Sequence, residues 1–281
     1  IIKVKQLIDK VAPTSSRVII YGNSGTGKDL VAKEIHKKSK YSNGNFIIVN
    51  SALLEPDGIE EELFGLEENS RIVKTGFFEQ ANNGTLFIDE IGDMPIQTQS
   101  KILRVLTDSS FYRVGSNMPV NINARLLCSS TENLEKLVEE GNFRMDLFHR
   151  LNVVSITLPN LSDRTQDIDE LIEYFSKIYL SNSNSEISDL RDYIKTNYIN
   201  YDWPGNVREL RNIIERYCII GGRIAENKEQ LDSGFNSKNV ISMPLKNARK
   251  IFEKNYLESQ IQRFNGNISK TASFIGMERS A

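Results

Sequence analysis

A glycine-rich segment at residues 21–29 limits the possible folds of this chain more than any other feature. It carries Gly22, Gly27 and Lys28 at the spacing G-x-x-x-x-G-K, directly after an apolar run and before a run with helical spacing. Strand, glycine-rich turn, lysine and helix follow one another in a phosphate-binding loop. The glycines of such a loop allow successive backbone N–H groups to point at phosphate oxygens. The alternative is a surface turn with a solvated lysine, and it leaves the spacing unexplained.

The segment is therefore predicted to bind a nucleotide, with Lys28 reaching the β- and γ-phosphates. The predicted nucleotide-binding residues of the loop are Gly22, Asn23, Ser24, Gly25, Thr26, Gly27, Lys28 and Asp29. Asp29 departs from the usual pattern, because such loops carry Ser or Thr after the lysine, whose hydroxyl contacts magnesium.

Five short apolar runs predict buried β-strands, and stretches with helical spacing lie between them. The runs are residues 17–21, 46–50, 85–89, 125–129 and 153–158. Near-continuous apolar strands that alternate with helices predict an α/β fold with a parallel sheet covered on both faces. Ligands bind beyond the carboxyl ends of such strands. Functional residues are therefore expected at or just after positions 21, 50, 89 and 130.

Two carboxylates, Asp89 and Glu90, end the third of these strands. A carboxylate at the tip of a buried strand near a phosphate loop can hold magnesium, so Asp89 is the predicted metal ligand. Glu90 is predicted to orient and deprotonate an attacking water. The alternative is a strand-end pair that forms ion pairs with nearby lysines. The phosphate loop elsewhere in the chain favours the catalytic interpretation.

Three arginines are candidates for contact with a phosphate. Arg208 follows Asn206, a predicted N-cap, and Glu209 completes a capping box. A cation in the first turn opposes the helix dipole, and a nucleotide phosphate nearby would explain it. The alternative is an arginine folded back onto Glu209. Arg144 and Arg150 lie six residues apart on a predicted helix and could reach a neighbouring subunit's nucleotide, but taken alone they fit weak surface ion pairs better.

The composition is that of an ordinary globular protein, with 39% hydrophobic residues, 26% charged residues and a net charge of −2. Without an overall basic excess, any contact with nucleic acid must be local. Cys128 and Cys218 lie in apolar runs, which is typical of core residues in a reducing compartment. No stretch has the length of a membrane span, and no signal peptide is recognisable. We therefore expect a cytoplasmic protein without a membrane partner.

The composition changes after Pro159, where helical spacing appears at 168–179 and 207–217 and a polar, linker-like stretch follows. Near the end, two short helices around a glycine turn at 265–267 predict a helix-turn-helix that breaks off at Ala281. The chain is therefore expected to be a piece of a longer protein. The predicted domains are an α/β nucleotide-binding part (1–159), a helical lid (160–222), a linker (223–244) and a partial helix-turn-helix (245–281).

Together these motifs resemble the central and C-terminal parts of NtrC-family response regulators, which are bacterial enhancer-binding AAA+ ATPases. The segments that carry the resemblance are 22–29, 84–95, 143–152, 203–210 and 264–279. The resemblance implies a P-loop AAA+ parallel-sheet sandwich, a small helical lid and a truncated Fis-type helix-turn-helix. It also implies ATP and Mg²⁺ as cofactors, and it makes Asp29 normal, since the family has an acid after the lysine.

The resemblance further assigns roles to single residues. It implies that Arg144 and Arg150 are arginine fingers that act in trans, that Arg208 is a sensor II residue, and that Asn50 controls the catalytic glutamate. Ser130 and Thr131 align with sensor I, where the family usually has Thr-Asn. The implied partners are DNA through the helix-turn-helix, RNA polymerase, a cognate histidine kinase through a missing receiver domain, and further copies of the chain, from dimer to hexamer.

One segment departs from the family pattern. Between Gly65 and Gly76 the family carries a loop with G-A-F-T-G-A, which engages the RpoN-type sigma factor (sigma-54). Residues 66–75 lack this motif and form a shorter segment, as in some members of the NtrX branch. This favours an ATP-binding, DNA-binding regulator of a two-component system that does not remodel the sigma-54 holoenzyme. The alternatives are a conventional sigma-54-dependent activator ATPase and a nucleotide-gated oligomerisation module with little hydrolysis.

Overall fold

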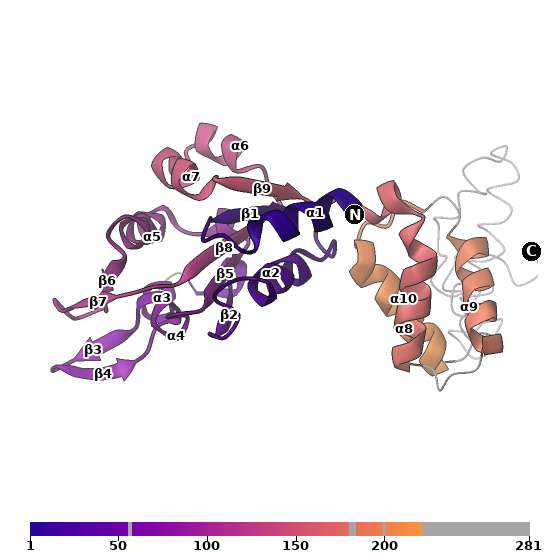
Figure 1. Cartoon of the computed structure of the whole chain (residues 1–281), viewed down its shortest axis with the longest axis horizontal. Coiled ribbons are helices and arrows are strands. Elements are labelled where there is room, and N and C mark those ends of the chain that lie inside the picture. Colours follow the sequence, from indigo (N-terminus) through magenta and orange to yellow (C-terminus); the bar gives the residue numbers. More distant parts are fainter. Residues whose placement is uncertain (56–57, 180–183, 199–200, 221–281) are drawn as a thin grey trace, which may run out of the picture. The chain divides into compact units, whose positions relative to one another are not determined.

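The computed structural model describes residues 1–55, 58–179, 184–198 and 201–220 (Figure 1). Residues Ile1–Cys218 form one compact unit, and every contact described below lies within it. The linker predicted at 223–244 and the helix-turn-helix predicted at 245–281 lie outside the described residues, so both stay predictions.

The five predicted strands form one parallel sheet, which confirms the predicted α/β fold. They are β1 (Val18–Tyr21), β2 (Phe46–Asn50), β5 (Thr85–Asp89), β8 (Arg125–Ser130) and β9 (Val154–Thr157), in the order β2-β5-β8-β1-β9. The carboxyl ends of neighbouring strands are in register: Asn50 pairs with Asp89, and Tyr21 pairs with Ser130. The predicted site positions at the strand ends therefore meet along one edge of the sheet.

Side chains of the central strands alternate between two cores, one on each face of the sheet. In β5, Leu86 and Ile88 pack into one core, while Phe87 packs into the other. In β1, Ile19 points to the first core and Ile20 to the second. This alternation follows from the two-residue period of a strand. Because both faces of the sheet are covered, these strands are apolar almost throughout. Polar side chains that could act on a ligand therefore lie at the ends of the strands.

Helices cover both faces of the sheet (Figure 1). Helices α1 (Ile2–Val11) and α2 (Lys28–Lys37) pack on the Phe87 face, through side chains that include Ile8 and Ile35. The opposite face is covered by α3 (Ile59–Phe64), α4 (Phe77–Gln80), α5 (Ile96–Asp108), α6 (Leu134–Glu139) and α7 (Met145–Leu151). Two short 3-10 helices, η1 (Ser51–Leu53) and η2 (Ile91–Asp93), follow the ends of β2 and β5.

Two short hairpins extend from this part of the chain, outside the main sheet (Figure 1). The first joins β3 (Leu66–Glu68) to β4 (Arg71–Lys74), and the second joins β6 (Ser110–Tyr112) to β7 (Pro119–Asn121). Asn69 and Ser70 have positive φ angles of 49° and 62°, as a tight two-residue hairpin turn requires. The first hairpin contacts the loop that joins β6 to β7, where Glu67 N–H donates to Val114 O at 2.9 Å. The segment that lacks the family's loop motif therefore forms a compact hairpin.

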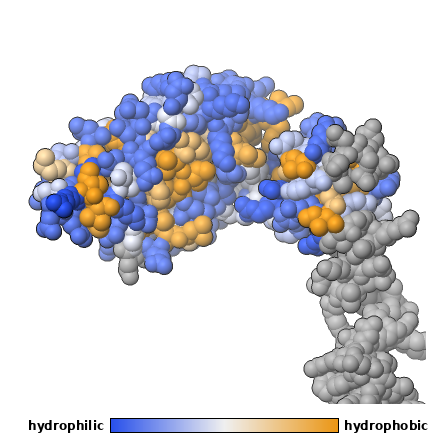
Figure 2. Space-filling model, turned by 90° about the horizontal axis from the view of Figure 1, so that it is seen from below, coloured by the Kyte–Doolittle hydropathy of each residue, from blue (hydrophilic) through white to orange (hydrophobic). Residues whose placement is uncertain are grey.

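The predicted helical lid is also present. It consists of η3 (Leu161–Arg164), α8 (Asp167–Tyr179), α9 (Asn184–Asn197) and α10 (Asn206–Ile220). These elements share a core around Trp203, Ile194 and Leu210. Within the described ranges, none of the helices has both the length and the apolar character needed to cross a membrane. On the face shown in Figure 2, several apolar patches lie between polar residues.

Candidate functional site

The predicted phosphate loop connects β1 to α2, and two of its glycines are required by its shape. Gly25 (φ 77°) and Gly27 (φ 102°) adopt left-handed backbone conformations, which other residues adopt only at a cost in free energy. At Gly25 a side chain would also collide, because a Cβ there would lie 2.2 Å from Gly205 O. Within the loop, Thr26 Oγ1 donates to Asn23 O at 2.7 Å. These constraints hold the loop in one conformation before α2 begins.

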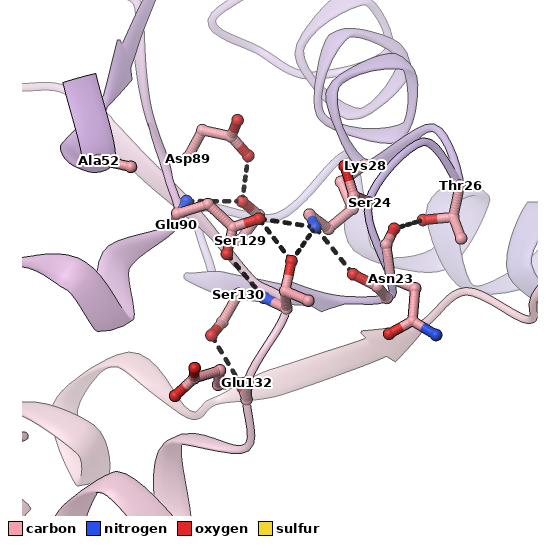
Figure 3. A network of polar contacts seen from close by, with 12 residues as sticks. Asn23, Ser24, Thr26, Lys28, Ala52, Asp89, Glu90, Ser129, Ser130 and Glu132 are labelled. Carbon is pink, nitrogen blue, oxygen red and sulfur yellow. Dashed lines mark hydrogen bonds and ion pairs between the residues drawn. The ribbon is translucent and has the colours of Figure 1, made fainter. Parts of the chain in front are cut away.

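Lys28 lies at the centre of a polar network at the carboxyl edge of the sheet (Figure 3). Its side chain is only 7% exposed, and its Nζ contacts Gly22 O, Thr131 Oγ1 and Glu90 Oε1, each at 2.8 Å. The predicted phosphate-binding lysine and the predicted catalytic carboxylate are thus in direct contact. An ion pair between this carboxylate and a lysine, the alternative to a catalytic role, is present. Its lysine, however, is Lys28 of the phosphate loop.

Glu90 occupies a left-handed turn with φ 53°, a conformation that is uncommon for a residue other than glycine. Its carboxylate accepts hydrogen bonds from Thr131 N–H at 2.8 Å and from Thr131 Oγ1 at 2.6 Å. Burial alone would raise the pKa of Glu90, but the hydrogen bonds from Lys28 and Thr131 outweigh it and hold the pKa below its ordinary value. Glu90 is therefore an anion at neutral pH.

Asp89 ends β5 directly beside Glu90, yet its partners are different. Ser129 Oγ donates to Asp89 Oδ1, and Asn50 Nδ2 donates to Asp89 Oδ2 at 3.3 Å. Both donors are uncharged, whereas the Glu90 carboxylate faces an ammonium group. The resemblance pairs Asn50 with the catalytic glutamate, but in this structure its amide contacts Asp89, and its control of Glu90 stays a prediction.

The residues at this edge fit a magnesium ion that binds together with a nucleotide. Protein sites for Mg²⁺ commonly supply one or two carboxylates, and phosphate oxygens and water complete the shell. Asp89 offers such a carboxylate at the strand tip. The exposed Asp29 side chain faces Lys33, with Oδ2 lying 3.9 Å from Nζ, and its role in nucleotide binding stays a prediction. No group of three or more His, Cys, Asp or Glu in the described part of the chain could hold a metal ion alone, so the phosphates would have to supply ligands.

The start of α10 brings the lid onto the phosphate loop. Arg208 Nη1 donates to Ser24 Oγ at 2.8 Å, and Asn206 Nδ2 donates to Ser24 O at 3.0 Å. The backbone N–H of Val207 donates to Gly25 O at 3.0 Å. Arg208, which is predicted to contact a phosphate, thus forms a hydrogen bond with a residue of the predicted phosphate loop. Its sensor II role stays a prediction.

The alternative offered for Arg208 is not present, and the capping box predicted for the start of α10 is wrong. Arg208 does not fold back onto Glu209, whose Oε2 accepts instead from Gly205 N–H at 2.9 Å. The side chain of Asn206 does not cap its own helix, because its Oδ1 accepts from Leu161 N–H at 2.8 Å and its amide nitrogen reaches the phosphate loop. Tertiary contacts with η3 and the loop therefore replace the local capping box.

Two residues of the site gave no signal in the sequence. Ser129 lies inside the apolar run that forms β8, and Arg164 lies in a polar stretch before α8. Arg164 Nη2 donates to Thr26 O at 3.0 Å, and burial lowers the pKa of Arg164. Both residues lie on segments that are remote in the chain from the phosphate loop, so only the folded structure identifies them as part of the site.

Arg144 and Arg150 lie away from the phosphate loop. Arg144 Nη2 forms an ion pair with Asp146 at 2.7 Å, and its Nη1 donates to Ser100 Oγ at 3.1 Å. Arg150 Nη2 donates to Leu106 O at 3.0 Å. The ion pair of Arg144 agrees with the plain surface interpretation. Both side chains are partly solvent-exposed, so contact with a second subunit stays a prediction.

Comparisons with known proteins identify three family models along the chain. The Sigma-54 interaction domain matches residues 1–157, an AAA+ ATPase lid domain matches residues 162–241, and the model described as bacterial regulatory protein, Fis family, matches residues 248–281. The first of these covers the sheet, the phosphate loop and both hairpins.

The chain is also similar to individual proteins. It is 40% identical over 294 residues to the nitrogen assimilation regulatory protein NtrX of Azorhizobium caulinodans, covering 99% of this chain and 65% of that protein. The crystal structure of NtrX from Brucella abortus is 42% identical, with a TM-score of 0.71 over 99% of this chain and 65% of that one. The same Brucella protein in complex with ATP gives a TM-score of 0.69 over 99% and 64% of the two chains. The chain thus spans slightly less than two thirds of these relatives.

Proposed function

The chain belongs to the family of the Sigma-54 interaction domain and is an NtrX-like regulator of the NtrC family, and from this premise we propose that it is the ATP-binding part of a DNA-binding transcription regulator that does not remodel the sigma-54 holoenzyme. The observation that carries the proposal is the compact hairpin at 66–74, which stands where the family's sigma-54 loop would be.

Nucleotide binding is supported by the loop geometry and by the Brucella relative, which was crystallised with ADP and with ATP. In the proposed site, the backbone of residues 22–28 surrounds the phosphates. Lys28 exchanges the Glu90 carboxylate for a phosphate oxygen, because a triphosphate carries more negative charge than one carboxylate. Arg208, on the lid helix α10, approaches the same phosphates, and its side chain already contacts Ser24 of the phosphate loop.

Asp89 would hold the magnesium ion, which neutralises phosphate charge when it is bound. Release from Lys28 leaves Glu90 with the hydrogen bonds from Thr131 and with its negative charge. Glu90 can then accept a proton from a water that attacks the γ-phosphate. Nucleotide binding would in this way free the base that hydrolysis requires.

The lack of sigma-54 remodelling is supported by the length and the turn of the hairpin. Its two strands are joined by Asn69 and Ser70 alone, so no extended loop remains to carry a sigma-binding motif. An ion pair and backbone hydrogen bonds also tie β3 and the residue before it to the loop between β6 and β7. ATP binding would then set the assembly or the DNA-bound form of a regulator that works with another form of RNA polymerase.

A conventional sigma-54-dependent activator ATPase is the second candidate, and the intact site favours it. Lys28, Asp89 and Glu90 lie together at the carboxyl edge of the sheet, as hydrolysis would require, and Arg144 and Arg150 are candidates for fingers that reach a neighbouring subunit. A chain that only sensed nucleotide would not need a catalytic base. This candidate requires a homo-oligomer of at least two subunits.

Further partners follow from the family alone. We propose that the segment matched by the Fis-family model binds DNA, and that RNA polymerase and a cognate histidine kinase act on the whole regulator in the cytoplasm.

The deciding experiment compares two polymerase forms with the purified full-length regulator and hydrolysable ATP. We expect no ATP-dependent open complexes at a sigma-54 promoter, and regulated transcription with the housekeeping polymerase. ATP-dependent open complexes with sigma-54 polymerase would overturn the proposal and establish the second candidate. The Glu90→Gln variant is the control, since it removes the proposed base.

A further inference from the structure

The two carboxylates at the end of β5 are held by different kinds of partners. Glu90 faces the Lys28 ammonium group at 2.8 Å. Asp89 has an uncharged donor on each oxygen, with Ser129 Oγ on Oδ1 and Asn50 Nδ2 on Oδ2. Neutral donors fix the direction of a carboxylate without cancelling its charge. The Lys28 ammonium group pairs with Glu90, and both hydrogen-bond donors of Asp89 are uncharged.

The two donors reach Asp89 from both of its neighbouring strands. Asn50 ends β2 and Ser129 lies near the end of β8, and β5 runs between them in the sheet. Ser129 is fully buried. Each carboxylate oxygen can accept more than one hydrogen bond or metal bond, so both oxygens of Asp89 retain free acceptor positions. The carboxylate is thus fixed in direction and still able to bind a cation.

Ser129 also sets the backbone of the neighbouring base. Its Oγ accepts from Glu90 N–H at 3.1 Å while it donates to Asp89 Oδ1. A hydroxyl can donate and accept at the same time, so one side chain fixes the direction of Asp89 and the left-handed turn at Glu90 (Figure 3). Without this acceptor, the Glu90 N–H would lose its partner at a strained backbone position.

We propose that Ser129 is a positioning residue of the nucleotide site, and that it acts with Asn50 as a clamp that holds Asp89 ready for the divalent cation that accompanies ATP. This inference rests on the proposed nucleotide binding. It gives Asn50 a role toward the metal carboxylate, and it assigns Ser129 a function beyond filling the sheet. Neither residue contacts the cation itself; both act through Asp89. Partners that orient a metal ligand typically change metal affinity by about 10–100-fold when they are removed.

The test compares Ser129→Ala with Ser176→Ala, a control at an equally buried serine of the lid helix α8. Ser176 Oγ donates to Ile172 O at 2.6 Å and to neither carboxylate. Mn²⁺ serves as the probe, and its affinity for the ATP complex is measured by electron paramagnetic resonance. ATP affinity without metal is measured by calorimetry in EDTA.

We expect Ser129→Ala to weaken Mn²⁺ binding about tenfold or more, with metal-free ATP affinity unchanged, and Ser176→Ala to leave both unchanged. Mn²⁺ affinity within twofold of the wild type in Ser129→Ala would overturn the proposal, and so would an equal loss in Ser176→Ala. If the wild-type chain binds no ATP with or without metal, the proposed function fails instead, and the two failures are distinguishable.

Asn50→Ala provides a second route if Ser129→Ala does not fold, because Asn50 is less buried. It should weaken Mn²⁺ binding in the same direction. In the double variant we expect a loss smaller than the product of the two single losses, because freeing one oxygen already lets the carboxylate turn. Fully independent losses would show that the two residues do not form one clamp.

Discussion

The nucleotide site and the hairpin at 66–74 are built in opposite ways. The site draws side chains from the carboxyl ends of three strands and from the lid, and its lysine is 7% exposed. The hairpin is formed by two strands that pair with each other. The side chains of Ile72 and Val73 on it are 55% and 58% exposed. Local elements with few buried contacts change shape or sequence at little cost to the rest of a fold. The proposed nucleotide site and the hairpin are therefore built from separable sets of contacts.

Ion pairs link the hairpin to neighbouring elements of the α/β part. Arg113 donates to Glu79 at 2.9 Å and to Glu67 at 3.1 Å, and these hydrogen bonds, the one to Glu79 foremost, raise the pKa of Arg113. Lys74 pairs with Glu62 of α3. If the two regions are separable, changes in the site should not affect the hairpin, and changes in the hairpin should not affect ATP affinity.

The largest effect is expected for Lys28→Ala. The substitution removes the cation that is proposed to meet the phosphates, and losing one member of a buried charge pair costs about 2–5 kcal/mol of binding free energy. ATP affinity should therefore fall by about thirtyfold or more, as measured by calorimetric titration. Lys33→Ala is the control, since that lysine is exposed and lies one turn further along α2. Unchanged affinity in Lys28→Ala would refute the assigned phosphate loop.

The next effect concerns turnover rather than binding. Glu90→Gln should bind ATP at least as well as the wild type, because Lys28 loses its competing ion pair. Hydrolysis should slow by about 10²–10⁴-fold, the usual worth of a positioned general base. Phosphate release by the full-length protein, at a concentration where it assembles, measures this. Wild-type turnover in the variant would show that another group is the base.

Arg113→Met tests the ion pairs that link the hairpin to neighbouring elements. Two carboxylates would lose a mostly buried partner, since the Arg113 side chain is 11% exposed. We expect the free energy of unfolding to fall by about 3 kcal/mol in urea denaturation, with ATP affinity unchanged. Lys101→Met, which removes an exposed pair with Glu60, should change stability by less than about 0.5 kcal/mol. A large loss of ATP affinity in Arg113→Met would mean that the two regions are coupled.

The sequence predicted what local patterns encode. The phosphate loop, all five strands of the sheet and the carboxylates at its edge carry signals within a few residues of chain, and the strands appear where they were expected. Ser129, Arg164 and the partners of Asn206 could not be predicted, because their contacts join segments that are brought together only by strand register and lid docking. Helix α9 was not predicted separately, because only a few of its residues, such as Leu190 and Ile194, are buried apolar ones.

The smallest effect, and the sharpest test of separability, is expected for the double substitution of Ile72→Ser and Val73→Ser. Both side chains are already more than half exposed, so stability should change by less than about 0.5 kcal/mol and ATP affinity should not change. Leu63→Ala, a fully buried change in the helix before the hairpin, should cost about 2–5 kcal/mol in the same urea denaturation. A loss in the double variant as large as that of Leu63→Ala would place the hairpin within the core and refute the comparison. If the double variant binds and hydrolyses ATP normally but loses transcriptional regulation in the full-length protein, the exposed hairpin strand is the surface through which the nucleotide state acts.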